Sequence, residues 1–226
     1  MAALNASLSY QDCLDAFDGI MVSDGNLSLV GISAKFTIAL SGKEHNDWLS
    51  YIVDVLTMFK TKLPSEPVQS RTRKSSRSGK EYDYCYVQSR LNRPGSFVHT
   101  QYSRWYSSID HNKHVPKDIR LSQVMIANWV MGDGTSAYRV SALNSVQFKF
   151  CTNGLSVGEV VLLITELNDR YHLGAILSVR KRGKGEPEIY VQKMEGVNRL
   201  MEIVQPYILP SYEYKIKKAC SVGDYI

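Results

Sequence analysis

Two aspartates are the residues best placed to do chemistry in this chain, because each ends an apolar run with the pair Asp-Gly. Asp24 closes residues 17–25, and Asp133 closes residues 126–134. The C-terminal end of a helix carries a partial negative charge and unpaired carbonyls, so an acid there costs up to ~1 kcal/mol unless a cation lies nearby. The glycine that follows is expected to close the last turn in the left-handed conformation. We therefore expect a cation beside each of the two aspartates.

The two runs lie about half the chain apart, which indicates an internal duplication. Small or short residues recur four positions apart in each run, Gly19 and Ser23 in the first, Asn128 and Gly132 in the second. Such positions share one face of a helix and allow two backbones to approach closely. If the two helices pack side by side, two carboxylates meet and repel each other. A divalent cation with hard oxygen ligands, Mg²⁺ by preference, would relieve that repulsion.

On these residues the chain resembles the LAGLIDADG homing endonuclease family, in its single-chain form with two motif copies. The first copy agrees at Gly19, Asp24 and Gly25, although Asp18 stands where the motif usually has a small residue. The second copy resembles the usual motif sequence more closely, at Ala127, Trp129, Met131, Asp133 and Gly134. Two copies at this spacing are a specific signal, whereas either copy alone would be weak.

The resemblance implies an active site shared by the two motifs. Asp24 and Asp133 would bind the divalent ions, and Ser23 and Gly132 would lend backbone carbonyls. Two or three Mg²⁺ ions would serve, and Mn²⁺ or Ca²⁺ could substitute for binding. Such ions lower the pKa of bound water and clamp the attacking and leaving oxygens. The family also keeps one lysine per half near the scissile phosphates. By position these are Lys113 and Lys215, which would stabilise the phosphorane charge and orient water.

The elements that must position these residues repeat in the same order in both halves. The first half shows, in order, a helix at 10–24, a change to strands after Gly25 that includes a strand at 35–40, a helix up to about 59, a basic hairpin at 68–80 with its return strand at 82–89, and a helix at 97–108. The second half shows a helix at 122–133, strands at 137–143 and 146–150, a helix at 157–171, strands at 175–182 and 188–192, a helix at 196–207, and a tail containing Lys215.

This order predicts an α+β fold with two pseudo-symmetric αββαββα halves. The first half is residues 1–114, the linker is residues 115–121, and the second half is residues 122–226. The two motif helices are expected to pack at the centre, and two antiparallel sheets are expected to form a DNA-binding saddle.

The strands alternate polar and apolar residues, and each half gathers cations at one end of a sheet. A pair of antiparallel strands can enter the DNA major groove, where Arg and Lys read guanine and Gln reads adenine, while hairpin tips hold phosphates. The candidate DNA-binding residues are Lys35, Arg71, Arg73, Lys74, Arg77 and Lys80 in the first half, and Arg139, Gln147, Lys149, Ser178, Arg180, Arg182 and Lys184 in the second. A solvated basic tip is the ordinary alternative, and the repetition of the cluster favours DNA. The row Tyr82, Tyr84 and Tyr86 fits cross-strand packing as well as nucleic-acid contact.

The composition is that of a globular, mildly basic chain. Its net charge is +5, from 27 basic and 22 acidic residues, which is compatible with nucleic acid without requiring it. The four cysteines lack metal-ligand spacing and indicate reduced, intracellular thiols. The longest aliphatic run, residues 160–164, is too short to span a bilayer. We therefore expect a soluble intracellular monomer that uses no membrane, with the mitochondrion, the chloroplast and the prokaryotic cytoplasm as candidate compartments.

The function implied by the resemblance is site-specific DNA cleavage by an intron homing endonuclease. Such an enzyme makes a double-strand break in a long asymmetric duplex target by divalent-metal-dependent phosphodiester hydrolysis. Two alternatives stay open: an RNA maturase that binds intron RNA and assists group I splicing, and a sequence-specific DNA-binding protein that does not cut. The presence of both Asp24 and Asp133 favours cleavage. The sequence carries no Gly-rich phosphate loop, dinucleotide pattern or Gly-x-Ser-x-Gly motif.

Overall fold

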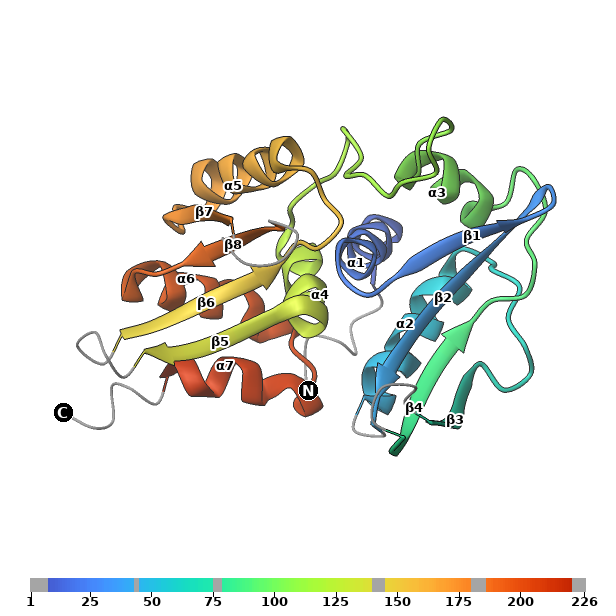
Figure 1. Cartoon of the computed structure of the whole chain (residues 1–226), viewed down its shortest axis with the longest axis horizontal. Coiled ribbons are helices and arrows are strands. Elements are labelled where there is room, and N and C mark those ends of the chain that lie inside the picture. The colour runs from blue at the N-terminus through green and yellow to red at the C-terminus, as the bar shows by residue number, and fades with distance from the viewer. Residues whose placement is uncertain (1–7, 43–44, 75–78, 140–144, 180–185, 221–226) are drawn as a thin grey trace. The chain divides into compact units, whose positions relative to one another are not determined.

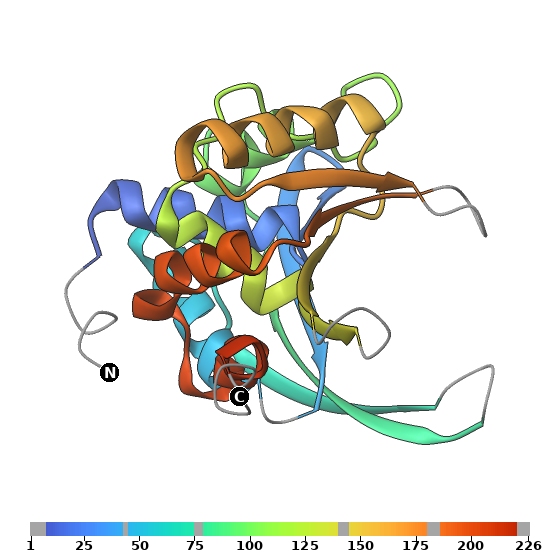
Figure 2. The same cartoon turned by 90° about the vertical axis from the view of Figure 1, so that its left-hand side faces the viewer.

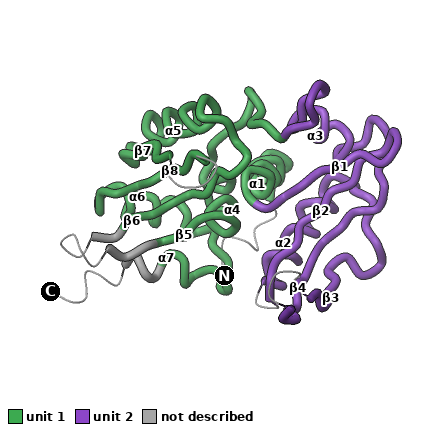
Figure 3. The backbone as a smooth tube through the Cα atoms, in the orientation of Figure 1, with its two compact units in different colours: residues 1–23, 113–226 green, residues 24–112 purple. Residues whose placement is uncertain are grey.

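The structure is a computed structural model, and it describes residues 8–42, 45–74, 79–139, 145–179 and 186–220. The chain divides into two compact units (Figure 3). Unit 1 contains residues 1–23 and 113–226, and unit 2 contains residues 24–112. The compact units therefore place the first helix with the second repeat. The predicted halves with a linker at 115–121 divide the chain by sequence repeat instead, and that division stays a prediction.

The order of elements confirms the predicted α+β class and the repeated αββαββα pattern (Figure 1). The first repeat is α1 (Tyr10–Val22), β1 (Asn26–Val30), β2 (Ser33–Ser41), α2 (Asn46–Met58), β3 (Val68–Lys74), β4 (Glu81–Gln88) and α3 (Phe97–Trp105). The second is α4 (Gln123–Asp133), β5 (Gly134–Arg139), β6 (Ser145–Cys151), α5 (Val157–Tyr171), β7 (Ala175–Val179), β8 (Pro187–Val191) and α6 (Met194–Val204). Two short 3-10 turns, η1 (Gln205–Tyr207) and η2 (Pro210–Tyr212), lead to a further helix, α7 (Glu213–Cys220).

Unit 2 is a four-stranded antiparallel sheet with helices α2 and α3 packed on one face. Its strand order is β1-β2-β4-β3, and α3 contacts β1 and β2 while α2 contacts β3 and β4. Alternation along β2 and β4 buries Phe36, Ile38 and Val87 beneath the helices. Residues between these positions therefore form a second, polar face of the sheet.

Unit 1 repeats this architecture around the sheet β5-β6-β8-β7. Helix α6 packs against β6, α5 packs against β7 and β8, and α7 lies beside β5. Phe148 and Phe150 of β6 are fully buried, and the ring of Trp129 from α4 lies 4.4 Å from that of Phe150. Because α4 runs directly into β5, this aromatic contact fixes the end of α4 against the sheet.

Helices α1 and α4 lie side by side within unit 1 (Figures 1 and 2). Their backbones approach at Gly19, where a Cβ atom would lie 2.2 Å from the carbonyl oxygen of Met125 and 2.8 Å from the Cβ of Asn128. Only a residue without a side chain allows this contact. Gly19 and Asn128 were predicted to lie on the helix interface, and the structure brings these two residues together.

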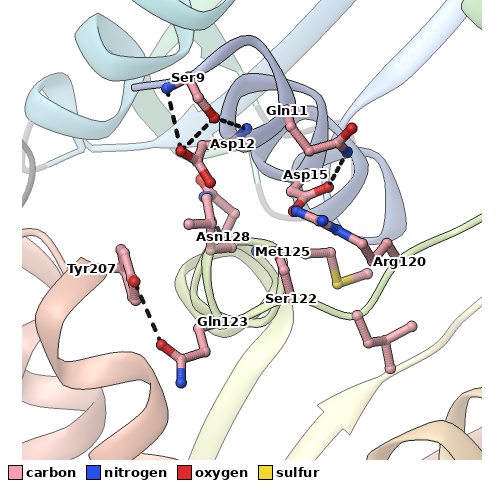
Figure 4. A network of polar contacts seen from close by, with 12 residues as sticks. Ser9, Gln11, Asp12, Asp15, Arg120, Ser122, Gln123, Met125, Asn128 and Tyr207 are labelled. Atoms are coloured by element: carbon pink, nitrogen blue, oxygen red, sulfur yellow. Dashed lines mark hydrogen bonds and ion pairs between the residues drawn. The ribbon is translucent and has the colours of Figure 1, made fainter. Parts of the chain in front are cut away.

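A polar network holds the first turns of the two helices (Figure 4). Ser9 begins α1 with a capping box, in which its hydroxyl accepts from the Asp12 N–H and the Asp12 carboxylate accepts from the Ser9 N–H. Asp15 is buried and accepts hydrogen bonds from Gln11 and from the Arg120 guanidinium, which raises the pKa of Arg120. The segment before α4 is thus tied to α1 by an ion pair.

The structure corrects three expected boundaries. Helix α1 ends at Val22 rather than Asp24, because Ser23 caps it. Strands were expected after Gly25, but only residues 35–40 were given bounds, and the structure adds β1 at residues 26–30. Residues 213–220 form helix α7 where a tail was expected. That helix has low mean hydropathy, so an apolar stripe did not mark it, yet Ile216 is buried.

Across the described residues, the structure contains no helix with both the length and the apolar character needed to cross a bilayer.

Substituting Gly19 by alanine tests the helix contact. The new methyl group would strike a backbone oxygen that cannot move aside, so we expect Gly19→Ala to destabilise the protein by about 1–3 kcal/mol despite the better helix propensity of alanine. Chemical denaturation would measure this loss. Gly158, in the first turn of α5, has open space around its Cβ position, so Gly158→Ala is the matched control and should be neutral or stabilising. Equal behaviour of the two variants would contradict the contact.

Candidate active site and nucleic-acid interface

The C-terminal end of α1 is closed by side chains. Ser23 is the capping residue, and its hydroxyl donates to the carbonyl oxygens of Gly19 and Ile20, both at 3.1 Å. The Nζ of Lys113 donates to the Ser23 carbonyl at 3.3 Å. Asp24 follows Ser23 directly in the chain. One of the two predicted lysines therefore reaches the end of the helix that precedes the first predicted acid.

The C-terminal end of α4 is closed in the same way by the other predicted lysine. Lys215, on α7, donates from Nζ to the carbonyl oxygens of Val130, Met131 and Gly132 at 3.1, 2.6 and 2.8 Å. Asp133 is the last residue of this helix and is half-buried. The cation that an acid at a helix end requires is thus present. It comes from helix α7, which was not predicted from the sequence.

Gly134 has a different role from the one expected. Its backbone is extended, with φ −71° and ψ 136°, so it does not close α4 in the left-handed conformation. A Cβ atom here would lie 2.6 Å from the Val130 carbonyl oxygen and 2.7 Å from Cζ of Phe148. Glycine is required because the chain turns from α4 into β5 against a buried ring, and this close packing fixes the position of the preceding Asp133.

Charged and polar side chains from the strands gather on the face of the unit 1 sheet opposite its apolar core. The strand register sets Lys149 opposite Tyr190 and Cys151 opposite Glu188, so these four side chains share one face. Lys149 forms an ion pair with Glu188 at 3.3 Å, and the Tyr190 hydroxyl donates to Glu188 at 3.1 Å. Glu188 is only 2% exposed. The acid is therefore compensated by two donors, which stabilises its charged form.

This cluster is electrostatically coupled to Asp133. Burial raises the pKa of the Cys151 thiol, Lys149 opposes that effect, and the negative charges of Asp133 and Glu188 add to it. Burial would lower the pKa of Lys149, but Cys151 and Glu188 outweigh it and raise that pKa. Cys151 is therefore a protonated thiol and Lys149 a cation at neutral pH, and Cys151 lies within electrostatic range of the second motif acid.

The chemistry of the predicted donor set suits a hard divalent ion. Asp24, Asp133 and the carbonyls of Ser23 and Gly132 offer only oxygen ligands, which Mg²⁺, Mn²⁺ and Ca²⁺ prefer. Within the described residues, no three His, Cys, Asp or Glu side chains gather to hold a metal. An ion here would therefore take its other ligands from carbonyls, water and substrate phosphate. Asp24 belongs to unit 2 and Asp133 to unit 1, and their meeting at one ion stays a prediction.

The polar face of the unit 2 sheet carries a continuous array of aromatic, amide and cationic groups. The rings of Tyr82, Tyr84 and Tyr86 contact one another along β4, with centroids 6.5 and 5.7 Å apart. The Arg71 guanidinium lies over the Tyr86 ring, 5.3 Å from its centroid, and the Tyr86 hydroxyl donates to Gln69. The tyrosine row is thus packed side by side, and it also orients a cation and an amide on this face.

The other predicted DNA-binding residues divide into three groups. Lys35 is half-buried on the same face as the tyrosines, whereas Arg73, Lys74 and Lys80 are exposed near the β3–β4 hairpin. In unit 1, Gln147, Lys149 and Ser178 are half-buried on β6 and β7, and the Gln147 side-chain oxygen is a buried acceptor for which the structure shows no hydrogen bond. Arg77, Arg180, Arg182 and Lys184 lie outside the described residues, and only the backbone of Arg139, in β5, is described.

Sequence reasoning missed several polar residues that the strand register adds to these faces. Gln88 donates to the Thr37 hydroxyl at 3.3 Å on the unit 2 face, and a pocket nearby is lined by Lys35, Gln69, Gln88 and Arg90 among others. Glu188, Tyr190 and Cys151 join the unit 1 face. Of these unit 1 residues, only Cys151 lies two positions from a predicted cation, Lys149, and could have been identified by that spacing; Glu188 and Tyr190 required the pairing of β6 with β8.

Comparison with known proteins assigns the chain to a family. The model of the LAGLIDADG DNA endonuclease family matches residues 14–198, and the chain belongs to that family. Among curated proteins, "Cytochrome b mRNA maturase bI2" of Saccharomyces cerevisiae is 32% identical over 121 residues, covering 51% of this chain and 27% of that protein. "Probable intron-encoded endonuclease 1" of Wickerhamomyces canadensis is 26% identical over 129 residues, covering 55% of this chain and 54% of that protein. The chain thus spans about a quarter to about half of the length of these relatives.

Solved structures share the fold. The homing endonuclease I-WcaI bound to its DNA recognition sequence superposes with a TM-score of 0.74 at 19% identity, covering 93% of this chain and 88% of that one. I-DmoI in complex with DNA and Mn gives a TM-score of 0.50 at 10% identity, covering 89% of this chain and all of that one. These likenesses confirm the predicted architecture of the homing endonuclease fold.

The reactivity of Cys151 tests the electrostatic cluster in solution. Asp133→Asn removes a negative charge that raises the thiol pKa, so alkylation should become about two- to fivefold faster at pH 8. Lys149→Met removes the opposing cation and should slow alkylation by a similar factor. Iodoacetamide labelling followed by peptide mass spectrometry measures both rates, with Cys220→Ser as the background. If both substitutions move the rate in the same direction, the arrangement is wrong.

Proposed function

We propose that this protein is an intron homing endonuclease that makes a double-strand break at a long, asymmetric DNA target by divalent-metal-dependent phosphodiester hydrolysis. The observation that carries the proposal is the matched pair of helix ends. Each motif helix is followed or closed by an aspartate, and each has its terminal carbonyls bound by a lysine from a distant segment. A protein that only bound nucleic acid would have no use for two such acids.

In this mechanism Asp24 and Asp133 would hold the divalent ions, and the carbonyls of Ser23 and Gly132 would be supporting oxygens. The ions, Mg²⁺ or Mn²⁺, would activate water and stabilise the leaving oxygen. Lys113 places its ammonium group beside the first helix end, where it neutralises charge that develops on the phosphate. Lys149, paired with Glu188, adds a second cation on the unit 1 face.

The polar sheet faces would bind the duplex. Cations at the β3–β4 hairpin contact phosphates, and Gln69 and Gln88, each held by a neighbouring hydroxyl, are oriented to read base edges in the major groove. The tyrosine row supplies apolar contact, for example to thymine methyl groups. We propose that one monomer uses both sheets for one target.

Loss of either acid should separate binding from cleavage. Asp24→Asn and Asp133→Asn keep the shape of the side chain but remove the charge needed to hold the ion. We expect both variants to bind the site selected from a randomised duplex library, and to cleave it at least about 100-fold more slowly with Mg²⁺. Gel-shift and single-turnover cleavage assays measure the two properties. Wild-type cleavage rates in either variant would refute the site assignment.

Salt dependence should identify the phosphate contacts. Arg73 is exposed on the polar face beside Tyr82, so Arg73→Gln should weaken binding to all duplex sequences and reduce the slope of log K against log salt by about 1. Arg170, on α5 beside Glu166, is the matched control, and Arg170→Gln should leave the slope unchanged. If Arg73→Gln leaves the slope of log K against log salt unchanged, Arg73 does not contact a DNA phosphate.

An RNA maturase is the second candidate function. One curated relative has the name of an mRNA maturase. In addition, a pocket lined by Lys60, Lys62, Arg93 and Phe97 lies between the end of α2 and the start of α3, on the helical side of unit 2. Cations beside an aromatic ring suit a nucleic-acid strand. Splicing of intron RNA by Asp24→Asn and Asp133→Asn would show that this activity is independent of cleavage.

A further inference from the structure

We propose that Lys215 is a positioning residue that fixes the end of α4, and with it Asp133, rather than a lysine that contacts the scissile phosphate. This inference rests on the proposed nuclease function. It changes the role that the family resemblance gave to Lys215 and leaves that role with Lys113.

The geometry of the ammonium group carries the inference. A lysine ammonium has three N–H donors and no acceptor. Three carbonyl oxygens, those of Val130, Met131 and Gly132, lie within 3.1 Å of Lys215 Nζ. The donor capacity of Lys215 is therefore used by the backbone of α4, and a phosphate oxygen could bind only by displacing one of these carbonyls.

The surroundings hold Lys215 in this position. Its Nζ lies 5.4 Å from the centroid of the Tyr212 ring, and Tyr212 is only 1% exposed. Ile216, the next residue on α7, is buried, and α7 packs against β5 and α6. The ammonium is thus held from a separate element, and the three carbonyls that it binds belong to the residues immediately before Asp133.

This arrangement has a direct consequence for the metal-binding acid. Cations at a helix C-terminus offset the negative end of the helix and so favour a carboxylate there. The Gly132 carbonyl already accepts a hydrogen bond from the ammonium at 2.8 Å, so it is less available as a ligand for a divalent ion. The carboxylate of Asp133 is therefore the principal ligand from this helix, and Lys215 determines where it points, as outer-shell partners of metal ligands do.

The two lysines should then differ in how their loss affects cleavage. Lys215→Met should raise the Mn²⁺ concentration at half-maximal single-turnover rate by about 10-fold or more, with the rate at saturating Mn²⁺ largely retained. Lys113→Met should lower the saturating rate by about 100-fold with little change in the midpoint. The substrate is the duplex selected from the randomised library. Calorimetric titration of Mn²⁺ into each protein bound to an uncleavable duplex should show the same weaker affinity for Lys215→Met without any turnover.

Controls separate positioning from general stability. Arg120→Met removes a different cation of unit 1, the partner of Asp15, and should lower Tm without moving the Mn²⁺ midpoint. Lys215→Arg keeps the charge but cannot place three N–H donors on one nitrogen. Its Mn²⁺ midpoint should therefore lie between those of wild type and Lys215→Met. Lys215→Arg also provides the test of the proposal if Lys215→Met does not fold.

Two results would overturn the proposal. One is a Lys215→Met variant whose saturating rate collapses while its Mn²⁺ midpoint and affinity are unchanged. The other is a midpoint that shifts in Arg120→Met as much as in Lys215→Met, since the effect would then follow stability alone. A wild-type protein that binds Mn²⁺ but does not cut any duplex would refute the nuclease function instead, and the calorimetric comparison would still test Lys215.

Discussion

The close approach of helices α1 and α4 at Gly19 is the contact on which the rest of unit 1 depends. With a backbone oxygen 2.2 Å from the position of a Cβ atom, the two helices are held at a distance that no side chain could maintain. This contact makes neighbours of two helices from different repeats. It is reinforced by the ion pair between Asp15 of α1 and Arg120 in the segment before α4, so the helix pair is constrained at a second point.

Negative charge accumulates at the C-terminal ends of both helices, and a lysine compensates it at each end. Each C-terminus carries partial negative charge, and each lies next to an aspartate. Lys113 and Lys215 come from remote segments and bind the terminal carbonyls, while Lys149 forms an ion pair with the buried Glu188 on the unit 1 sheet. Acids and cations thus alternate around these helix ends, an arrangement on which the proposed divalent-ion site depends.

Periodicity predicted most of the fold because alternation in strands and apolar runs in helices are local properties. Residues 35–40, 157–171 and the Asp-Gly motifs were recognised in this way. Helix α7 was missed because its mean hydropathy is low and its place is set by a tertiary contact through Lys215. The role of Gly134 was misjudged for the same reason, since its constraint is the ring of Phe148, which is distant in sequence. Glu188 and Tyr190 joined the candidate site only when the pairing of β6 with β8 was known.

The compact unit that contains the second motif also contains α1, with residues 24–112 intervening in the chain. During synthesis, α1 therefore emerges long before α4, the helix against which it packs at Gly19. Until then the apolar surface of α1 is exposed to water and to other nascent chains, a condition in which aggregation competes with folding. We therefore expect production of this protein to depend on translation speed and on chaperones that shield α1.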